Sequence, residues 1–166
     1  MEIDWIRPES KADIEVLLSK YQFDLFIGSV HHVHSIPVDY DRKLYLEARE
    51  KSGGTDERLF EDYFDLQYEM LQALRPPIVG HLDLIRLLSD DPNVDCRQWP
   101  SVWEKAVRNL KFIAEYGGVL ELNTAALRKG MREVYPKVEI AKVCLLSLLQ
   151  LVHRADINIG VPCYGR

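Results

Sequence analysis

The stretch Asp24-Leu25-Phe26-Ile27-Gly28-Ser29-Val30 is followed at once by His31-His32-Val33-His34. A compact apolar run of this length is typical of a buried β-strand in a parallel sheet. The histidines then lie just beyond the carboxyl end of the strand, where parallel α/β folds gather their catalytic groups. This segment predicts a buried strand, followed by a loop at 31–41 that carries the histidines.

Short apolar runs alternate with amphipathic segments along the rest of the chain. Besides 24–30, we expect strands at Ile3–Ile6, 78–80, 119–122 and 157–161. Helices are expected at 8–20, 42–50, 56–74, 101–116 and 136–152, with Ser101 as an N-cap and Pro136 at a helix start. Such alternation predicts parallel βαβ units. About five strands fall short of a complete eight-stranded barrel, so we expect one domain containing a partial barrel or an open sheet.

The composition excludes several classes of protein. A net charge of -5 over 166 residues and a pI near 5.5 argue against a non-specific nucleic-acid binder. No apolar run approaches the ~20 residues of a membrane span. Three cysteines without a CxxC pair indicate a reducing compartment. The first residues do not resemble a signal peptide, and the predicted location is therefore cytoplasmic.

Polar side chains follow three of the expected strands. His31–His34 come after the second strand, His81 and Asp83 after the third, and Glu121 and Asn123 at the fourth. Because parallel strands end at one edge of a sheet, the imidazoles can meet in one cavity. The sequence therefore predicts His31 and His81 as the centre of a site.

Imidazole is a ligand for zinc, iron and manganese, and carboxylates from Glu2, Asp39 or Asp83 would balance the charge of a multinuclear site. Such ions activate water and clamp a phosphoryl group. Each histidine alone has a plainer interpretation as a hydrogen-bonded loop residue, and Glu2 as a solvated one. We expect one or two of the three histidines between positions 31 and 34 to touch metal.

Arg128 and Lys129 follow Asn123 closely enough to reach an anion at the same edge. Arginine binds phosphate through paired hydrogen bonds, although an ordinary exposed basic loop remains the alternative. The aromatic series Phe60, Tyr63, Phe64 and Tyr68 is expected to be core. His153, on the last helix, is expected to be structural or exposed.

Several strings occur in an order that is more specific than any one of them. They are 2–4 (EID) with 7–9 (RPE), 26–31 (FIGSVH), 80–84 (GHLDL), 121–128 (ELNTAALR) and 133–136 (EVYP). Together they resemble the histidinol-phosphatase branch of the PHP (polymerase and histidinol phosphatase) superfamily, especially its fungal members.

The resemblance implies a distorted (β/α)7 barrel that holds a cluster of divalent metal ions (Zn, Mn or Fe). It implies hydrolysis of L-histidinol phosphate, a small phosphorylated substrate, to L-histidinol and phosphate in histidine biosynthesis. The attacking group would be a metal-activated water, with no covalent phosphoenzyme.

The resemblance also implies roles for particular residues. Glu2 looks like the carboxylate that bridges metals, and His31 looks like a metal ligand at a strand end. His81 looks like a metal ligand or substrate contact in the cavity, and both histidines are assigned as catalytic. Arg128, with Asn123 beside it, looks like a phosphate-binding arginine, and His34 is assigned to substrate binding.

Two departures from the family pattern leave an alternative open. The family begins with a His-x-His strand that is absent before Glu2, and ends its barrel with an Asp-x-His pair that is absent from 143–166. We therefore expect a partial PHP-type barrel that lacks its first strands and has a divergent tail at 143–166. The alternative function is a catalytically incomplete, non-enzymatic fragment of a PHP-domain protein.

Overall fold

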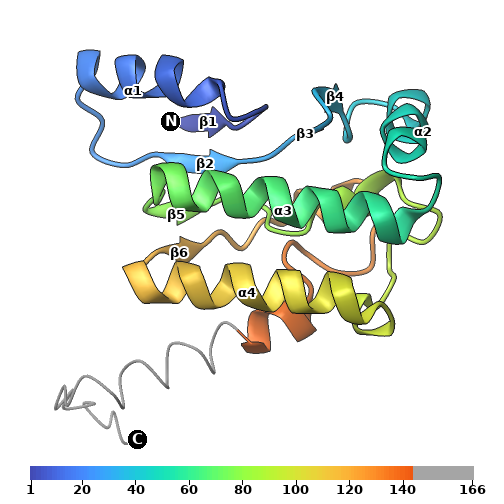
Figure 1. The fold of residues 1–166 in the computed structure, drawn as a ribbon. Coiled ribbons are helices and arrows are strands. Elements are labelled where there is room, and N and C mark those ends of the chain that lie inside the picture. The colour runs from blue at the N-terminus through green and yellow to red at the C-terminus, as the bar shows by residue number, and fades with distance from the viewer. Residues whose placement is uncertain (144–166) are drawn as a thin grey trace, which may run out of the picture.

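The computed structural model describes residues 1–143, which form an α/β fold (Figure 1). Its strands are β1 (Glu2–Asp4), β2 (Ile27–Ser29), β3 (His32–Val33), β4 (Ile36–Pro37), β5 (Ile78–Val79) and β6 (Val119–Leu120). Its helices are α1 (Ser10–Lys20), α2 (Arg42–Lys51), α3 (Asp56–Leu74), α4 (Pro100–Tyr116) and α5 (Ala125–Arg128), with 3-10 turns η1 (Leu84–Leu88) and η2 (Cys96–Gln98). Residues 138–143 are also helical. The rest of the helix expected to 152, His153, the strand expected at 157–161 and the tail lie outside the described residues.

Four strands form one parallel sheet in the order β1-β2-β5-β6. Ile3 lies opposite Gly28, and Gly28 lies opposite Val79. The predicted parallel α/β sheet is confirmed. Within residues 1–143, β1 and β6 are its edge strands.

The two faces of the sheet differ because side chains alternate along a strand. Ile3 and Val79 are buried on the face that meets the helices. A Cβ atom added to Gly28 on this face would lie 2.7 Å from the ring of Pro76, so glycine permits this close packing. Figure 1 shows α3 and α4 side by side along the sheet. The opposite face carries the side chain of Glu2, which is exposed, and the site lies where this side chain meets the residues that follow the carboxyl ends of β2 and β5.

The loop predicted at 31–41 contains a short antiparallel hairpin of β3 and β4. His34 and Ser35, the two residues between these strands, have φ values of 53° and 61°. Two central residues with positive φ are typical of a type I′ turn, which usually carries asparagine and glycine. The sequence did not predict this hairpin within the loop, because neither residue is a usual signal for this turn.

The strands expected from the sequence were longer than those in the structure. β2 covers three residues of the seven at 24–30, and Leu25 is 56% exposed before it. β1 begins one residue earlier than expected and ends at Asp4, although the amide of Trp5 still donates to the carbonyl of Ser29. The ends of each strand are set by its hydrogen bonds to the neighbouring strand. An apolar run in the sequence does not show where that pairing begins or ends.

The N-cap predicted at Ser101 was wrong. Helix α4 begins at Pro100, with Trp99 at the N-cap position, and the Ser101 hydroxyl donates to the carboxylate of Glu61 at 2.9 Å. Proline at the first helical position has its φ preset for the helix, which explains the earlier start. Pro136 precedes the helical residues 138–143 and follows a cis peptide bond.

Within residues 1–143, no helix combines the length and apolar character needed to cross a membrane.

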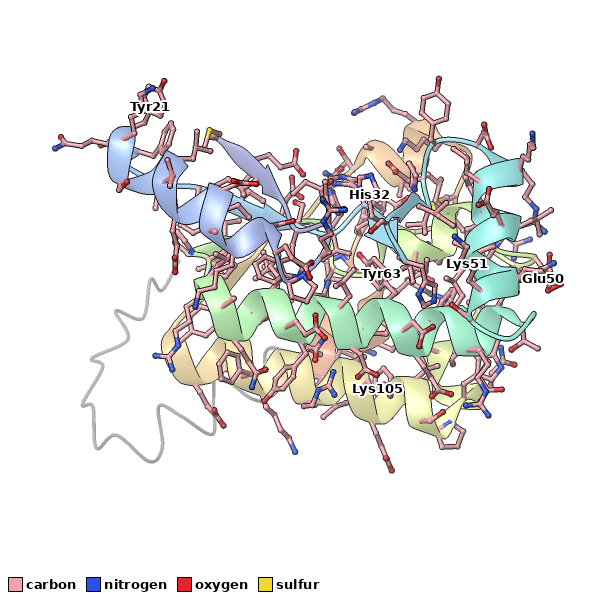
Figure 2. The ribbon with its side chains drawn as sticks, turned by 45° about the horizontal axis from the view of Figure 1, so that its top comes forward. Tyr21, His32, Glu50, Lys51, Tyr63 and Lys105 are labelled. Atoms are coloured by element: carbon pink, nitrogen blue, oxygen red, sulfur yellow. The ribbon has the colours of Figure 1, made fainter. Side chains whose placement is uncertain are left out.

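The core lies between the sheet and helices α3 and α4. Phe60, Tyr63 and Phe64 are fully buried, as the sequence predicted, while Tyr68 is half-buried beneath the guanidinium of Arg108. Figure 2 shows Tyr63 inside the protein and Tyr21 projecting outward at the end of α1.

A pair of buried amides joins the helices to the loop that carries His81. Asn109 on α4 donates to the carbonyl of Phe64 at 2.8 Å and to the Gln67 side-chain oxygen at 3.1 Å. Gln67 in turn donates to the carbonyl of Leu82 at 3.0 Å. This chain of hydrogen bonds fixes the backbone next to His81 from beneath.

Replacing Asn109 by Ala should lower the free energy of unfolding by about 1–3 kcal/mol, because the buried oxygen of Gln67 loses its donor. Urea unfolding followed by circular dichroism measures this change. Glu115→Ala, on the exposed side of the same helix, is the control and should stay within about 0.5 kcal/mol of the parent chain. Equal effects of the two substitutions would contradict this account.

Candidate metal centre

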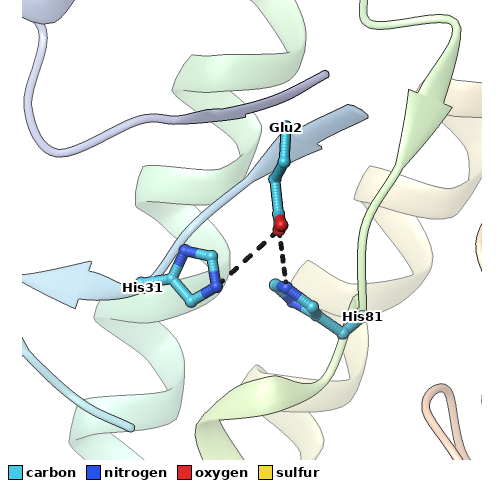
Figure 3. A group of neighbouring side chains, drawn as sticks. All are labelled: Glu2, His31 and His81. Atoms are coloured by element: carbon cyan, nitrogen blue, oxygen red, sulfur yellow. Dashed lines mark hydrogen bonds and ion pairs between the residues drawn. The ribbon is translucent and has the colours of Figure 1, made fainter. Parts of the chain in front are cut away.

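Glu2, His31 and His81 lie close together although they are far apart in the sequence (Figure 3). Glu2 is on β1, His31 follows β2 by two residues, and His81 follows β5 by two residues. The Glu2 Oε1 atom is 3.1 Å from His81 Nε2 and 3.8 Å from His31 Nε2. The parallel sheet brings together the three residues that the sequence predicted as metal ligands.

The carboxylate of Glu2 is held in its ionised form. The hydroxyl of Ser29 donates to Oε1 at 2.6 Å. Burial alone would raise the pKa of Glu2, but the hydrogen bond from Ser29 and the interactions with His81 and His31 lower it overall. An ionised carboxylate is the form that ligates a metal ion.

His31 is oriented by Asp4. Its Nδ1 lies 3.3 Å from Asp4 Oδ1, and its backbone amide donates to the same oxygen at 3.1 Å. Burial disfavours the charged ring, but the contact with Asp4 outweighs it and raises the pKa of His31. With Nδ1 directed at a carboxylate, Nε2 is left facing Glu2 and His81, an arrangement common around metal-ligating histidines.

His81 is held differently. Burial and the neighbouring His31 charge lower its pKa, which favours the neutral ring that binds metals. Its Nε2 faces Glu2, whereas its buried Nδ1 has no hydrogen-bond partner among the described residues. Its backbone amide donates to Glu121 Oε2 at 3.0 Å, so Glu121 fixes the main chain at this point.

Gly80 makes this approach possible. A Cβ atom at this position would lie 2.4 Å from the Ser29 hydroxyl and 3.6 Å from Glu121 Oε2. Any larger residue would push Ser29 away from Glu2. Asp4 and Ser29 were not predicted as supporting residues, although each lies two residues from a predicted ligand. Glu121 was predicted to lie at this edge of the sheet, but not to support His81.

Of the other carboxylates proposed as ligands, Asp83 lies outside the cluster of Glu2, His31 and His81. Its side chain is 1% exposed and accepts from Arg86 Nε at 2.9 Å and from the backbone amide of Lys137 at 3.0 Å. Asp83 was one of three alternatives for the carboxylate, and among the described residues Glu2 is the one that lies with the two histidines. Asp39 lies near enough for its charge to raise the pKa of His31.

The three predicted substrate contacts differ in their relation to this centre. Asn123 donates to Glu121 Oε1 at 3.1 Å and is thereby linked to it. Arg128 is exposed at the end of α5. His34 is at the hairpin turn, where its Nε2 lies 2.9 Å from Asp62 and 3.0 Å from Ser52. Binding of substrate by these residues stays a prediction.

The donor set fits a divalent transition-metal ion. One oxygen and two imidazole nitrogens lie within 4.8 Å of one another, and ligands that share one ion at about 2.0–2.2 Å lie roughly 3–4 Å apart. Three protein ligands with an open position are typical of catalytic rather than structural sites. Residues 1–143 contain one such group, so a second ion would need further ligands.

A parallel α/β sheet with a cluster of histidine and carboxylate side chains beside its strand ends is the arrangement found in α/β proteins that bind metal ions. This chain has that arrangement. The PHP domain family matches residues 1–125, and the chain belongs to this family.

Two relatives of the chain are named as histidinol-phosphatases. The chain is 42% identical over 156 residues to a "probable histidinol-phosphatase" of Schizosaccharomyces pombe, covering 93% of this chain and 51% of that protein. It is 36% identical over 130 residues to the histidinol-phosphatase of Saccharomyces cerevisiae, covering 66% and 39%. The chain thus spans about half the length or less of these curated relatives.

A solved structure has the same fold. The crystal structure of a Listeria monocytogenes protein assigned as a histidinol phosphatase superposes with a TM-score of 0.73 at 21% identity. The match covers 89% of this chain and 58% of that one. At this identity the likeness establishes the fold.

Replacing Asp4 by Asn should weaken binding of Zn²⁺ to the full chain about 10–100-fold, because the His31 ring loses its orienting carboxylate. Competition with a chromophoric chelator measures the affinity. Asp24→Asn removes the same charge from an exposed site after α1 and should leave the affinity unchanged. Indistinguishable affinities for the two variants would show that Asp4 does not support the centre.

Proposed function

We propose that the chain carries the metal centre of a phosphomonoesterase that hydrolyses L-histidinol phosphate to L-histidinol and phosphate. The single observation that carries this proposal is the cluster of Glu2, His31 and His81 at the strand ends. The names of the relatives support the choice of substrate. The non-enzymatic alternative has no comparable observation in its favour.

Zinc, manganese or iron bound at this centre would supply Lewis-acid stabilisation of charge on the phosphoryl group. Glu2 is ionised and balances the charge of the ion, while the neutral ring of His81 offers Nε2 as a ligand. His31 offers its Nε2 because Asp4 occupies the other ring nitrogen. These residues are held in position before any ligand arrives, which limits the cost of ordering them.

Substrate binding is proposed on the side of Asn123 and Arg128. Asn123 is joined to the centre through Glu121, whose other oxygen accepts from the amide of His81. Arg128 is five residues further along and exposed, and a guanidinium group there could pair with a phosphate group. His34 would act from the hairpin if it left Asp62.

We further propose that the sheet is part of a distorted barrel that holds more than one ion. Both edge strands, β1 and β6, have no neighbour on one side within residues 1–143. The relatives and the Listeria structure are longer than this chain, which supports further strands in the complete fold. Further strand ends would also supply ligands for a second ion.

Replacing His31 by Ala or Glu2 by Gln should reduce phosphate release from L-histidinol phosphate by more than about 100-fold. Removing a metal ligand should lower activity more than removing a residue that only orients a ligand. The full chain is loaded with Zn²⁺ or Mn²⁺, and released phosphate is measured by a colorimetric assay. Glu115→Gln, on the exposed side of α4, should keep the parent rate.

Metal content is measured on the same samples. A parent chain that binds metal but releases no phosphate would reject the catalytic proposal for this chain and favour the non-enzymatic alternative. A parent chain that binds no metal would reject the metal centre as well.

A further inference from the structure

The ring of His81 is held mainly by packing. Its Nδ1 is buried without a hydrogen-bond partner among the described residues, in contrast to the Nδ1 of His31, which meets Asp4. Glu2 contacts Nε2 alone, and one contact does not fix the plane of a ring. The orientation of His81 must therefore come from the aromatic rings around it.

Two rings contact His81 edge to face. The ring of His31 lies at a centroid distance of 4.7 Å with an interplanar angle of 65°. The ring of Tyr135 lies at 6.4 Å with an angle of 74°. Tyr135 is 1% exposed, and its hydroxyl contacts Met131 Sδ at 3.1 Å. It thus forms a rigid wall beside His81.

Arg86 holds this wall in place. Its guanidinium lies 4.8 Å from the centroid of the Tyr135 ring, a distance typical of a cation–π contact. Nη2 donates to the backbone carbonyls of Glu133 and Val134, immediately before the tyrosine. The arginine is fully buried, so its charge acts without screening by water.

Asp83 connects Arg86 to the loop that carries His81. Its carboxylate accepts from Arg86 Nε at 2.9 Å and from the amide of Lys137 at 3.0 Å. It lies two residues after His81, so one buried ion pair fixes both the loop that carries the histidine and the segment that carries Tyr135. Burying an ion pair removes water from both charges, so such a pair often adds little to the free energy of unfolding. Its clearer effect is to fix the relative positions of the segments that it joins.

We infer that Tyr135, held by Arg86 and Asp83, is a positioning residue that sets the ring plane of His81 for metal ligation. This inference rests on the proposed metal centre. A tyrosine that only filled the core would stabilise the fold without influencing the affinity for metal. The flat ring, rather than the hydroxyl, is the group that matters.

The test compares Tyr135→Phe with Tyr135→Leu in the full chain. The phenylalanine variant keeps the ring and should bind Co²⁺ and Zn²⁺ within about 2-fold of the parent. The leucine variant loses the wall and should bind about 10–100-fold more weakly, as for loss of other supporting groups. It should also alter the visible spectrum of the Co²⁺ complex.

Phe60→Leu is the matched control for stability. Phe60 is fully buried and packs edge to face on Trp99 at 5.2 Å, in a different part of the core. It should lower the urea midpoint about as much as Tyr135→Leu while leaving metal affinity unchanged. Parent-like affinity in the Tyr135→Leu variant, or equal losses in both leucine variants, would overturn the inference.

Ring motion in the metal-free chain separates this inference from the proposed function. NMR relaxation of the His81 ring should show increased mobility in Tyr135→Leu and no change in Tyr135→Phe. If the parent binds no metal, the proposed function fails, yet this measurement still decides whether Tyr135 orients His81. Unchanged ring mobility in Tyr135→Leu would overturn the inference on its own.

Discussion

The parallel register of β1, β2 and β5 is the constraint on which the site depends. Ile3 is paired with Gly28 and Gly28 with Val79, which places Glu2 on the opposite face, beside Ser29. A slip of one residue would turn Glu2 toward the helices, because side chains alternate between faces. The glycines at 28 and 80 protect this register, since each lies where a Cβ atom would collide with a neighbour.

The two histidines of the centre are held in position by different interactions. A carboxylate orients His31 and raises its pKa, whereas burial and the charge of its neighbour lower the pKa of His81. One ring is thus fixed by electrostatics and the other by aromatic packing against Tyr135. Both arrangements leave Nε2 directed toward Glu2, so the cluster needs little rearrangement to accept an ion.

Much of this centre could be predicted from local sequence. His31 and His81 each follow an apolar strand, and the carboxyl ends of parallel strands meet by geometry. The supporting residues could not be predicted in this way. Asp83 was one of three possible carboxylate ligands because it follows His81, but it is buried against Arg86 and lies outside the cluster. The hairpin turn at His34 was missed because its positive φ values follow from strand pairing rather than from residue type.

The sequence by itself determined the α/β class, the alternation of strands and helices and the two histidines at strand ends, because hydrophobic periodicity is a local property of the chain. The strand-end pattern left Glu2, Asp39 and Asp83 open as the carboxylate and only the family resemblance pointed to Glu2, which the tertiary structure places beside both histidines. Glu2 is separated from His81 by most of the described chain and reaches it through strand order, which no local pattern encodes. The same holds for Tyr135, whose place beside His81 is supported by hydrogen bonds from Arg86, a residue far from it in the sequence, to the carbonyls of Glu133 and Val134.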